Sequence, residues 1–96
     1  MRADNQPQKV EPLSFEHDLK VWPQFFIKLK SGEKTFELRR ADRNYQIGDT
    51  LLLREWNPMT ERYTGERVQR RITYITRGPG FGIEAGYVVL ALSPFV

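Results

Sequence analysis

Hydrophobic positions recur at the spacing of a helical turn in one stretch of the chain, from residue 22 to residue 32. Pro23 suits the first turn of a helix, where its missing amide hydrogen is not needed. Gly32 stands where a left-handed C-terminal cap is favoured. The spacing therefore predicts a helix over residues 23–31. Its apolar positions, at i, i+3, i+4 and i+7, are Trp22, Phe25, Phe26 and Leu29, and we expect Trp22 in the core.

Elsewhere the hydrophobic period is two, which is the period of a β-strand. A helix combined with several short, mostly antiparallel strands is typical of an α+β domain. We expect about five to six strands that curl into a small barrel or half-barrel, with the helix covering an open end. The predicted strands are residues 15–21, 34–40, 51–56, 66–76 and 87–92, with a turn at 47–50, a hairpin connection at 57–65 and a glycine-rich loop at 78–86.

The first 14 residues show neither period and are rich in polar residues and proline. We expect residues 1–14 to form a disordered N-terminal tail. The length of 96 residues, with 40% hydrophobic and 28% charged residues, is that of an ordinary globular domain. Residues 15–96 are therefore predicted to form a single domain.

The strand predicted over residues 34–40 has two different faces, because alternate side chains of a strand point the same way. Phe36 and Leu38 share one face and are expected in the core. Glu37 and Arg39 share the other. That polar face is either a solvated outer surface or the wall of a cleft, and the spacing alone favours the solvated surface.

The formal net charge of +3 is mild, but the basic residues are not evenly spread. Residues 39–77 hold nine arginines and five acidic residues, whereas the rest of the chain is slightly acidic. An arginine-rich segment suits partners that carry phosphate. It is also typical of solvated strand faces, and the charge alone favours this second interpretation.

The composition excludes several kinds of site. The chain has no cysteine, which excludes disulfides and cysteine-based zinc sites. A single histidine and scattered carboxylates give no metal-ligand spacing, so we expect neither a metal nor a cofactor. No apolar run approaches the roughly 18 residues that span a membrane, and the N-terminus lacks a signal peptide pattern. We expect a cytoplasmic, monomeric protein without a membrane partner.

The stretch SGEKTFELRR matches the pattern GxKxxExR at Gly32, Lys34, Glu37 and Arg39. It is preceded by the predicted helix and followed by GDTLLLREW and GPGFGIEAGYVVLAL. With these segments the chain resembles the ASCH domain of the PUA-like superfamily, in a branch of small, uncharacterised bacterial and phage proteins, over about residues 15–92. The resemblance implies a PUA-like β-barrel, a cleft beside the motif, and a role with RNA or a modified nucleoside.

The three charged side chains of the motif, together with Lys20, suit the binding of RNA or a nucleotide. Glu37 can accept hydrogen bonds from the exocyclic amine of a base, and Arg39 can hold that carboxylate ionised through a charge-assisted bond. Lys20 and Lys34 can meet phosphate as mobile point charges. We therefore predict a binding cleft lined by these four residues.

Aromatic rings and the lone histidine are weaker candidates. Bases in single-stranded RNA are commonly stacked on aromatic side chains, and Trp56, Tyr45 and Tyr63 are candidate platforms. For each ring, packing in the core or over a hairpin is the favoured interpretation. His17 can act as a general acid or base, although a lone histidine is more often structural.

Whether the chain is an enzyme is left open. Some ASCH-like proteins are amidohydrolases that deacetylate acetylated cytidine, and others are reported as ribonucleases. The amidohydrolases use a threonine where this chain has Glu37, whereas Lys34 is retained. General acid–base work by Lys34 with Glu37 or Glu55 on modified nucleosides or RNA is the alternative to a binding module. A protein-interaction domain is a third possibility.

Overall fold

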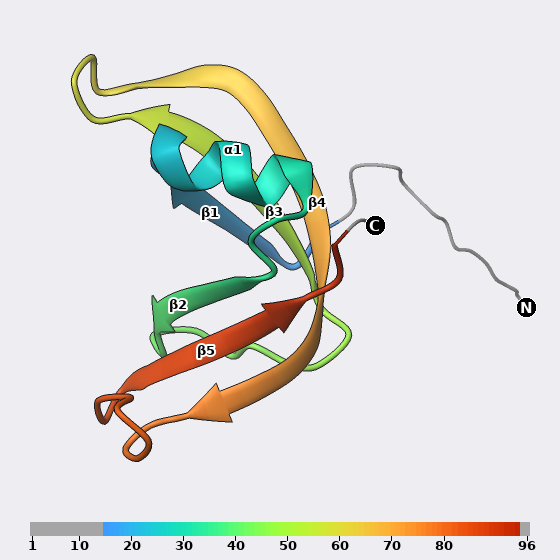
Figure 1. Ribbon diagram of the computed structural model, residues 1–96, viewed down its shortest axis with the longest axis vertical. Helices are drawn as coiled ribbons and strands as arrows, with labels where there is room; N and C mark the ends of the chain where they lie inside the picture. The colour runs from blue at the N-terminus through green and yellow to red at the C-terminus, as the bar shows by residue number, and fades with distance from the viewer. Residues whose placement is uncertain (1–14, 95–96) are drawn as a thin grey trace, which may run out of the picture.

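The computed structural model describes residues 15–94 and shows an α+β domain with a five-stranded mixed sheet and a short helix (Figure 1). The predicted N-terminal tail, residues 1–14, lies outside the described residues. In chain order the elements are β1 (His17–Val21), α1 (Pro23–Ser31), β2 (Phe36–Arg40), β3 (Thr50–Asn57), β4 (Arg62–Arg77) and β5 (Tyr87–Leu92).

The strands lie in the order β1-β3-β4-β5-β2. β1 runs parallel to β3, and the other neighbouring pairs are antiparallel. β4 has 16 residues and pairs with β3 through its first half and with β5 through its second half. Figure 1 shows β4 curving between these halves, so that the sheet is C-shaped with β1 and β2 at its two ends. The sheet does not close, and the predicted barrel is not confirmed.

The helix begins and ends at the predicted residues, Pro23 and Ser31. Pro23 stands at its first position. Gly32 adopts φ 86° and its amide donates to the carbonyl of Leu29 at 3.2 Å, which is the left-handed cap that glycine favours. Within residues 15–94, no helix is long and apolar enough to cross a membrane.

Hydrophobic side chains from α1 and from every strand except β2 meet in one core. Tyr45, from the connection between β2 and β3, joins them with its ring almost wholly enclosed. The buried hydrophobic residues of this core are Leu19, Val21, Phe26, Leu29, Tyr45, Leu51, Leu53, Ile72, Val88, Leu90 and Leu92.

The orientation of β2 is the opposite of the predicted one. Phe36 and Leu38, predicted in the core, are 48% and 58% exposed, whereas Glu37 is 5% exposed. The pairing with β5 explains the difference, because Glu37 lies beside Leu90, one of the core residues. Partners in an antiparallel pair point to the same face, so Glu37 faces inward and its two hydrophobic neighbours face outward.

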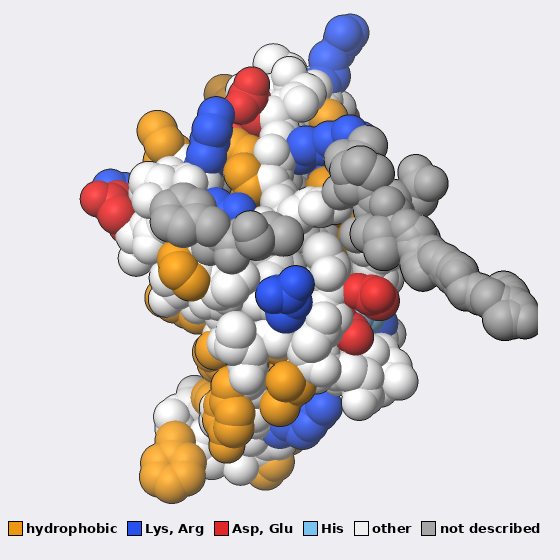
Figure 2. Space-filling view, turned by 90° about the vertical axis from the view of Figure 1, so that its right-hand side faces the viewer, with side chains coloured by type: hydrophobic (Ala, Val, Ile, Leu, Met, Phe, Trp, Pro, Cys, Tyr) orange, Lys and Arg blue, Asp and Glu red, His pale blue; other side chains and the backbone are white. Residues whose placement is uncertain are grey.

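The prediction of a buried Trp22 is also wrong, since this side chain is 46% exposed. Trp22 precedes α1 and has extended backbone angles, φ −70° and ψ 153°. It therefore does not follow the helical spacing that buries Phe26 and Leu29 one and two turns later. Figure 2 shows further exposed hydrophobic side chains gathered low on the molecule, at the height of β5 and the end of β4 in Figure 1. Tyr74 of β4 and Phe81, in the connection between β4 and β5, are both exposed.

Candidate functional site

The charged residues of the motif converge where α1 gives way to β2. Gly32 ends the helix, Lys34 lies in the connection, and Glu37 and Arg39 share the inward face of β2. Lys34 has the wrong strand parity to meet Glu37. Lys34 nevertheless contacts Glu37, because β2 begins only at Phe36 and the alternation of side chains in a strand does not apply to Lys34.

Glu37 is held between two cations. Lys34 Nζ donates to Oε1 at 3.0 Å, and Arg39 donates to Oε2 from Nε at 2.9 Å and from Nη2 at 2.7 Å. The carboxylate side chain is only 6% exposed, so both oxygens are shielded from water and compensated by charge-assisted bonds. A buried carboxylate is stable in such an arrangement, because its lost hydration is replaced by close ion pairs.

Both cations also make a second bond that fixes their position. Lys34 Nζ donates to the carbonyl of Phe36 at 2.6 Å. Arg39 Nη2 donates to the carbonyl of Lys20 at 2.9 Å, which joins β2 to β1 across the open side of the sheet. The side chains of the site are therefore held by backbone groups of both sheet edges.

A cavity of about 540 Å³ lies against this ion-paired group. It is bounded by the end of β1, the start of α1 and the strand β2, so it occupies the gap between the two unpaired sheet edges. Its size suits a small organic ligand. The lining residues are Lys20, Val21, Trp22, Phe25, Lys34, Phe36, Glu37, Leu38 and Arg39.

The cavity combines a polar end with aromatic walls. A carboxylate has about four acceptor positions and an ammonium group has three donors. The bonds described use one acceptor position of Glu37 Oε1 and two donors of Lys34, which by this count leaves a donor and an acceptor for a ligand. Lys34 Nζ also lies 4.4 Å from the centroid of the Phe36 ring. Trp22, Phe25 and Phe36 line the same cavity and are each about half exposed.

These three rings are the site residues that sequence reasoning missed. The sequence pattern places Trp22 and Phe25 on the apolar helix face and Phe36 in the core. For Trp22 the sequence does contain a signal that it is not part of the helix face. Pro23 marks the first helical position, and a residue before that position does not lie on the helix face. Phe36 could be placed only from the pairing of β2 with β5.

The other aromatic candidates lie elsewhere. Trp56 is on β3, outside the cavity lining, with Lys20 Nζ 4.2 Å from its ring centroid. Tyr63 is on β4 with the guanidinium of Arg54 3.8 Å from its ring. Tyr45 is 1% exposed and cannot serve as a stacking platform for a ligand. Burial raises the pKa of its phenol, because the phenolate would lose its hydration.

Glu55, the other carboxylate considered for acid–base work, is not part of the cavity lining. Its Oε1 accepts a hydrogen bond from the Thr64 hydroxyl at 2.6 Å, which links β3 to β4. The glycine-rich loop, residues 78–86, contributes no lining residue either, so it does not form a rim of this cavity.

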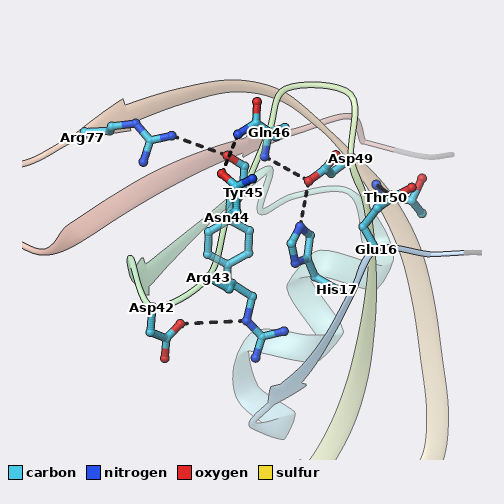
Figure 3. A network of polar contacts seen from close by, with 10 residues as sticks. All are labelled: Glu16, His17, Asp42, Arg43, Asn44, Tyr45, Gln46, Asp49, Thr50 and Arg77. Carbon is cyan, nitrogen blue, oxygen red and sulfur yellow. Dashed lines mark hydrogen bonds and ion pairs between the residues drawn. The ribbon is translucent and has the colours of Figure 1, made fainter.

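His17 is buried on β1, away from the cavity lining, in a separate polar network (Figure 3). Its Nε2 lies 2.8 Å from Oδ2 of Asp49, and the same oxygen accepts the backbone amide of Gln46. Its ring centroid is 4.6 Å from that of Tyr45. The contacts fasten the connection between β2 and β3 onto β1, which is a structural role.

A metal centre finds no support among residues 15–94, where the structure shows no group of three or more His, Cys, Asp or Glu side chains placed to hold an ion. Glu37 already has two cationic side chains as partners. Its chemistry is therefore that of an oriented anionic hydrogen-bond acceptor.

Comparison with known proteins relates the chain to a protein family and to a phage protein. A family model described as "Domain of unknown function (DUF3850)" matches residues 16–92, which include every helix and strand described above. The chain is also 42% identical over 60 residues to the "Uncharacterized 12.9 kDa protein in GpA 3'region" of Escherichia phage P2. The alignment covers 62% of this chain and 53% of that protein, so the chain spans about half the length of the curated relative it matches. The resemblance to the ASCH domain stays a prediction.

Proposed function

The chain belongs to the family described as "Domain of unknown function (DUF3850)", and we propose that it is a binding module that holds RNA or a nucleotide in the cleft beside Glu37. The cleft is the cavity between β1, α1 and β2 described above. The proposal includes the PUA-like relationship, which the motif from Gly32 to Arg39 supports, although the sheet is open.

The single observation that carries the proposal is the buried carboxylate at the polar end of an aromatic-walled cavity. A protein gains little stability from an ion pair held in this way, because the cost of desolvating the charges offsets their attraction. Such a carboxylate, oriented by Lys34 and Arg39, is suited to recognise a ligand that donates hydrogen bonds. The ligand must also present a flat apolar face to the rings.

A nucleobase meets both requirements. The edge of cytosine places an amine donor beside a ring acceptor, which can pair with Glu37 and with the remaining donor of Lys34. Stacking on an aromatic side chain contributes about 1–3 kcal/mol per base, and Phe25 or Phe36 offers such a face. Lys20 also lines the cavity and is exposed, so a phosphate attached to the base can reach it.

The proposal is tested with Lys34→Ala. Titration calorimetry of the wild-type protein with the four nucleoside monophosphates is expected to give measurable binding. The variant should bind at least about tenfold more weakly, since it loses a hydrogen bond from a charged donor worth about 1.5–3 kcal/mol. Circular dichroism checks that the variant is folded.

Lys28→Ala is the matched control. Lys28 is an exposed lysine of α1, outside the cavity lining, whose ammonium pairs with Glu33. This variant loses the same charge and should bind as the wild type does. Equal affinity of the Lys34→Ala and wild-type proteins for every nucleotide would contradict the proposal.

The hydrolase alternative has one observation in its favour, the 3.0 Å contact between Lys34 and Glu37 inside the cavity. An amine and a carboxylate so close can exchange a proton with a bound substrate. Incubation of the protein with acetylated cytidine, followed by chromatography, distinguishes the two functions. Appearance of cytidine that depends on Glu37 would establish the hydrolase in place of a binding module.

A further inference from the structure

Three basic side chains stand in a row across three adjacent strands. Lys20 of β1 lies beside Arg54 of β3 in the parallel pair, and Arg54 lies opposite Arg67 of β4 in the antiparallel pair. Partners in register point to the same face of a sheet. Strands are about 4.8 Å apart, so the row is about 10 Å long. We refer to Lys20, Arg54 and Arg67 as the cation row.

The cation row lies on the face of the sheet that points away from the core. Each member is followed or preceded along its strand by a residue that packs inward: Leu19 beside Lys20, Leu53 beside Arg54 and Val68 beside Arg67. Like charges placed directly opposite in a sheet lower its stability. The weak contact of Arg54 Nη1 with Asp18 Oδ2 at 3.4 Å compensates little of this repulsion. Local rules broken in this way are typical of functional surfaces.

Aromatic rings accompany the row. Trp56 of β3 and Tyr63 of β4 are a register pair, next along the hairpin from Arg54 and Arg67. Lys20 Nζ lies 4.2 Å from the centroid of the Trp56 ring, and the Arg54 guanidinium lies 3.8 Å from that of Tyr63. The guanidinium plane and the rings offer flat faces beside the positive charges, which is the combination that holds single-stranded nucleic acid.

The cation row is also continuous with the candidate site. Lys20 lines the large cavity beside Glu37. At the other end Arg54 and Arg67 line a second cavity of about 110 Å³, together with Tyr63, Gly65 and Glu66, whose carboxylate is paired with Lys30. A ligand that starts in the large cavity and leaves it past Lys20 therefore meets Arg54 and Arg67 in turn.

We propose that the cation row binds the phosphates of single-stranded RNA, so that the preferred ligand is an oligonucleotide with one base in the cleft and the following phosphates on Lys20, Arg54 and Arg67. The inference rests on the proposed function, because the cleft supplies the base contact. It adds that a mononucleotide uses only part of the site. An acidic peptide would satisfy the charges of the row but would leave its ring and guanidinium faces without stacking partners.

The test uses the double variant Arg54→Gln/Arg67→Gln. Fluorescence anisotropy with a labelled single-stranded RNA hexanucleotide of mixed sequence gives the affinity at several salt concentrations. Three phosphate contacts predict a slope of log affinity against log salt near −2, at about 0.7 per contact. The variant should lose about tenfold in affinity at low salt, and the slope should fall in magnitude by about 1.4. The substitutions relieve repulsion, so the fold is expected to persist.

The control Lys28→Gln/Arg43→Gln removes the same net charge from exposed side chains that line neither of the two cavities. It should retain the wild-type affinity and slope. Unchanged hexanucleotide binding by the Arg54/Arg67 variant would overturn the inference, even if mononucleotides still bind the cleft. Equally tight binding of hexaglutamate would also overturn it. Absence of any mononucleotide binding by the wild type, with hexanucleotide binding that depends on Arg54 and Arg67, would leave the cation row supported and the cleft refuted.

Discussion

At the scale of single residues, Glu37 is where the fold and the candidate site meet. It occupies a position on β2 that the pattern of the strand allots to the outside, yet it is buried. The cost of burying a carboxylate is offset because Lys34 and Arg39 supply three donor contacts to its two oxygens. Removing the negative charge leaves two mostly buried cations without a counterion, so the residue should matter for stability as well as for binding.

Glu37→Gln is therefore expected to lower the free energy of unfolding by about 1–3 kcal/mol. Urea denaturation measures this change through the midpoint. Glu33→Gln is the control, because Glu33 pairs with Lys28 on the surface, where the side chains are 64% and 59% exposed and water screens the charges. A Glu37→Gln midpoint equal to that of the Glu33→Gln protein would show that Lys34 and Arg39 do not need Glu37 as a counterion in the folded protein.

At the scale of elements, the helix is attached to the sheet by an arginine of a strand. Arg70 of β4 is 6% exposed, and its Nη2 donates to the carbonyls of Leu29 and Lys30 at 3.0 and 3.3 Å. These are last-turn carbonyls of α1, where the helix dipole favours a cation. Burial lowers the pKa of Arg70, but an arginine remains charged at physiological pH. The same contact holds the helix end from which the connection to β2 starts.

Arg70→Met should lower the free energy of unfolding by about 2 kcal/mol, since the methionine fills the space but cannot donate to the helix carbonyls. Arg71→Met, at the exposed neighbouring position, is the matched control and should have little effect. Urea denaturation of both variants gives the comparison. If both proteins unfold at the wild-type midpoint, Arg70 does not fasten the helix.

At the scale of the whole molecule, the cleft exists because the sheet is bent but not closed. β1 and β2 are the two edge strands, and the cavity occupies the gap between them. Arg39 crosses this gap by donating to the backbone of Lys20. A planar guanidinium can bond Glu37 and the carbonyl at once, which a lysine ammonium does with poorer geometry. The spacing of the two edges thus depends on one side chain of the site.

Arg39→Lys is expected to speed amide hydrogen exchange in β1 and β2 and to leave β3 and β4 nearly unchanged, because local opening of the edges becomes easier. Exchange followed by NMR resolves the strands. Arg40→Lys, at the next and exposed position of β2, is the control and should exchange as the wild type does. If the amides of β1 and β2 exchange at the same rates in the Arg39→Lys and Arg40→Lys proteins, Arg39 does not hold the two edges together.

Local signals in the sequence determined the elements. Pro23 and Gly32 set the bounds of α1, and the last strand has the predicted bounds, 87–92. The first residues of β2 and the length of β4 differ from the prediction. Gly65 indicates the end of a hairpin connection, but β4 begins at Arg62 and continues through it, and no local signal keeps residues 34–35 outside the strand. Capping and periodicity act over a few residues, which is why they can be read without the fold.

The sequence analysis also predicted that Lys20, Lys34, Glu37 and Arg39 line one cleft, and in the structure all four line one cavity. Only the tertiary structure decided that Glu37 points inward and that the cavity walls are aromatic. A hydrophobic period of two indicates which side chains share a face of the strand, but the neighbouring strands decide which of the two faces is buried. For the same reason the cation row could not be seen in the sequence, since its members lie on three strands and meet only through the order and register of the sheet.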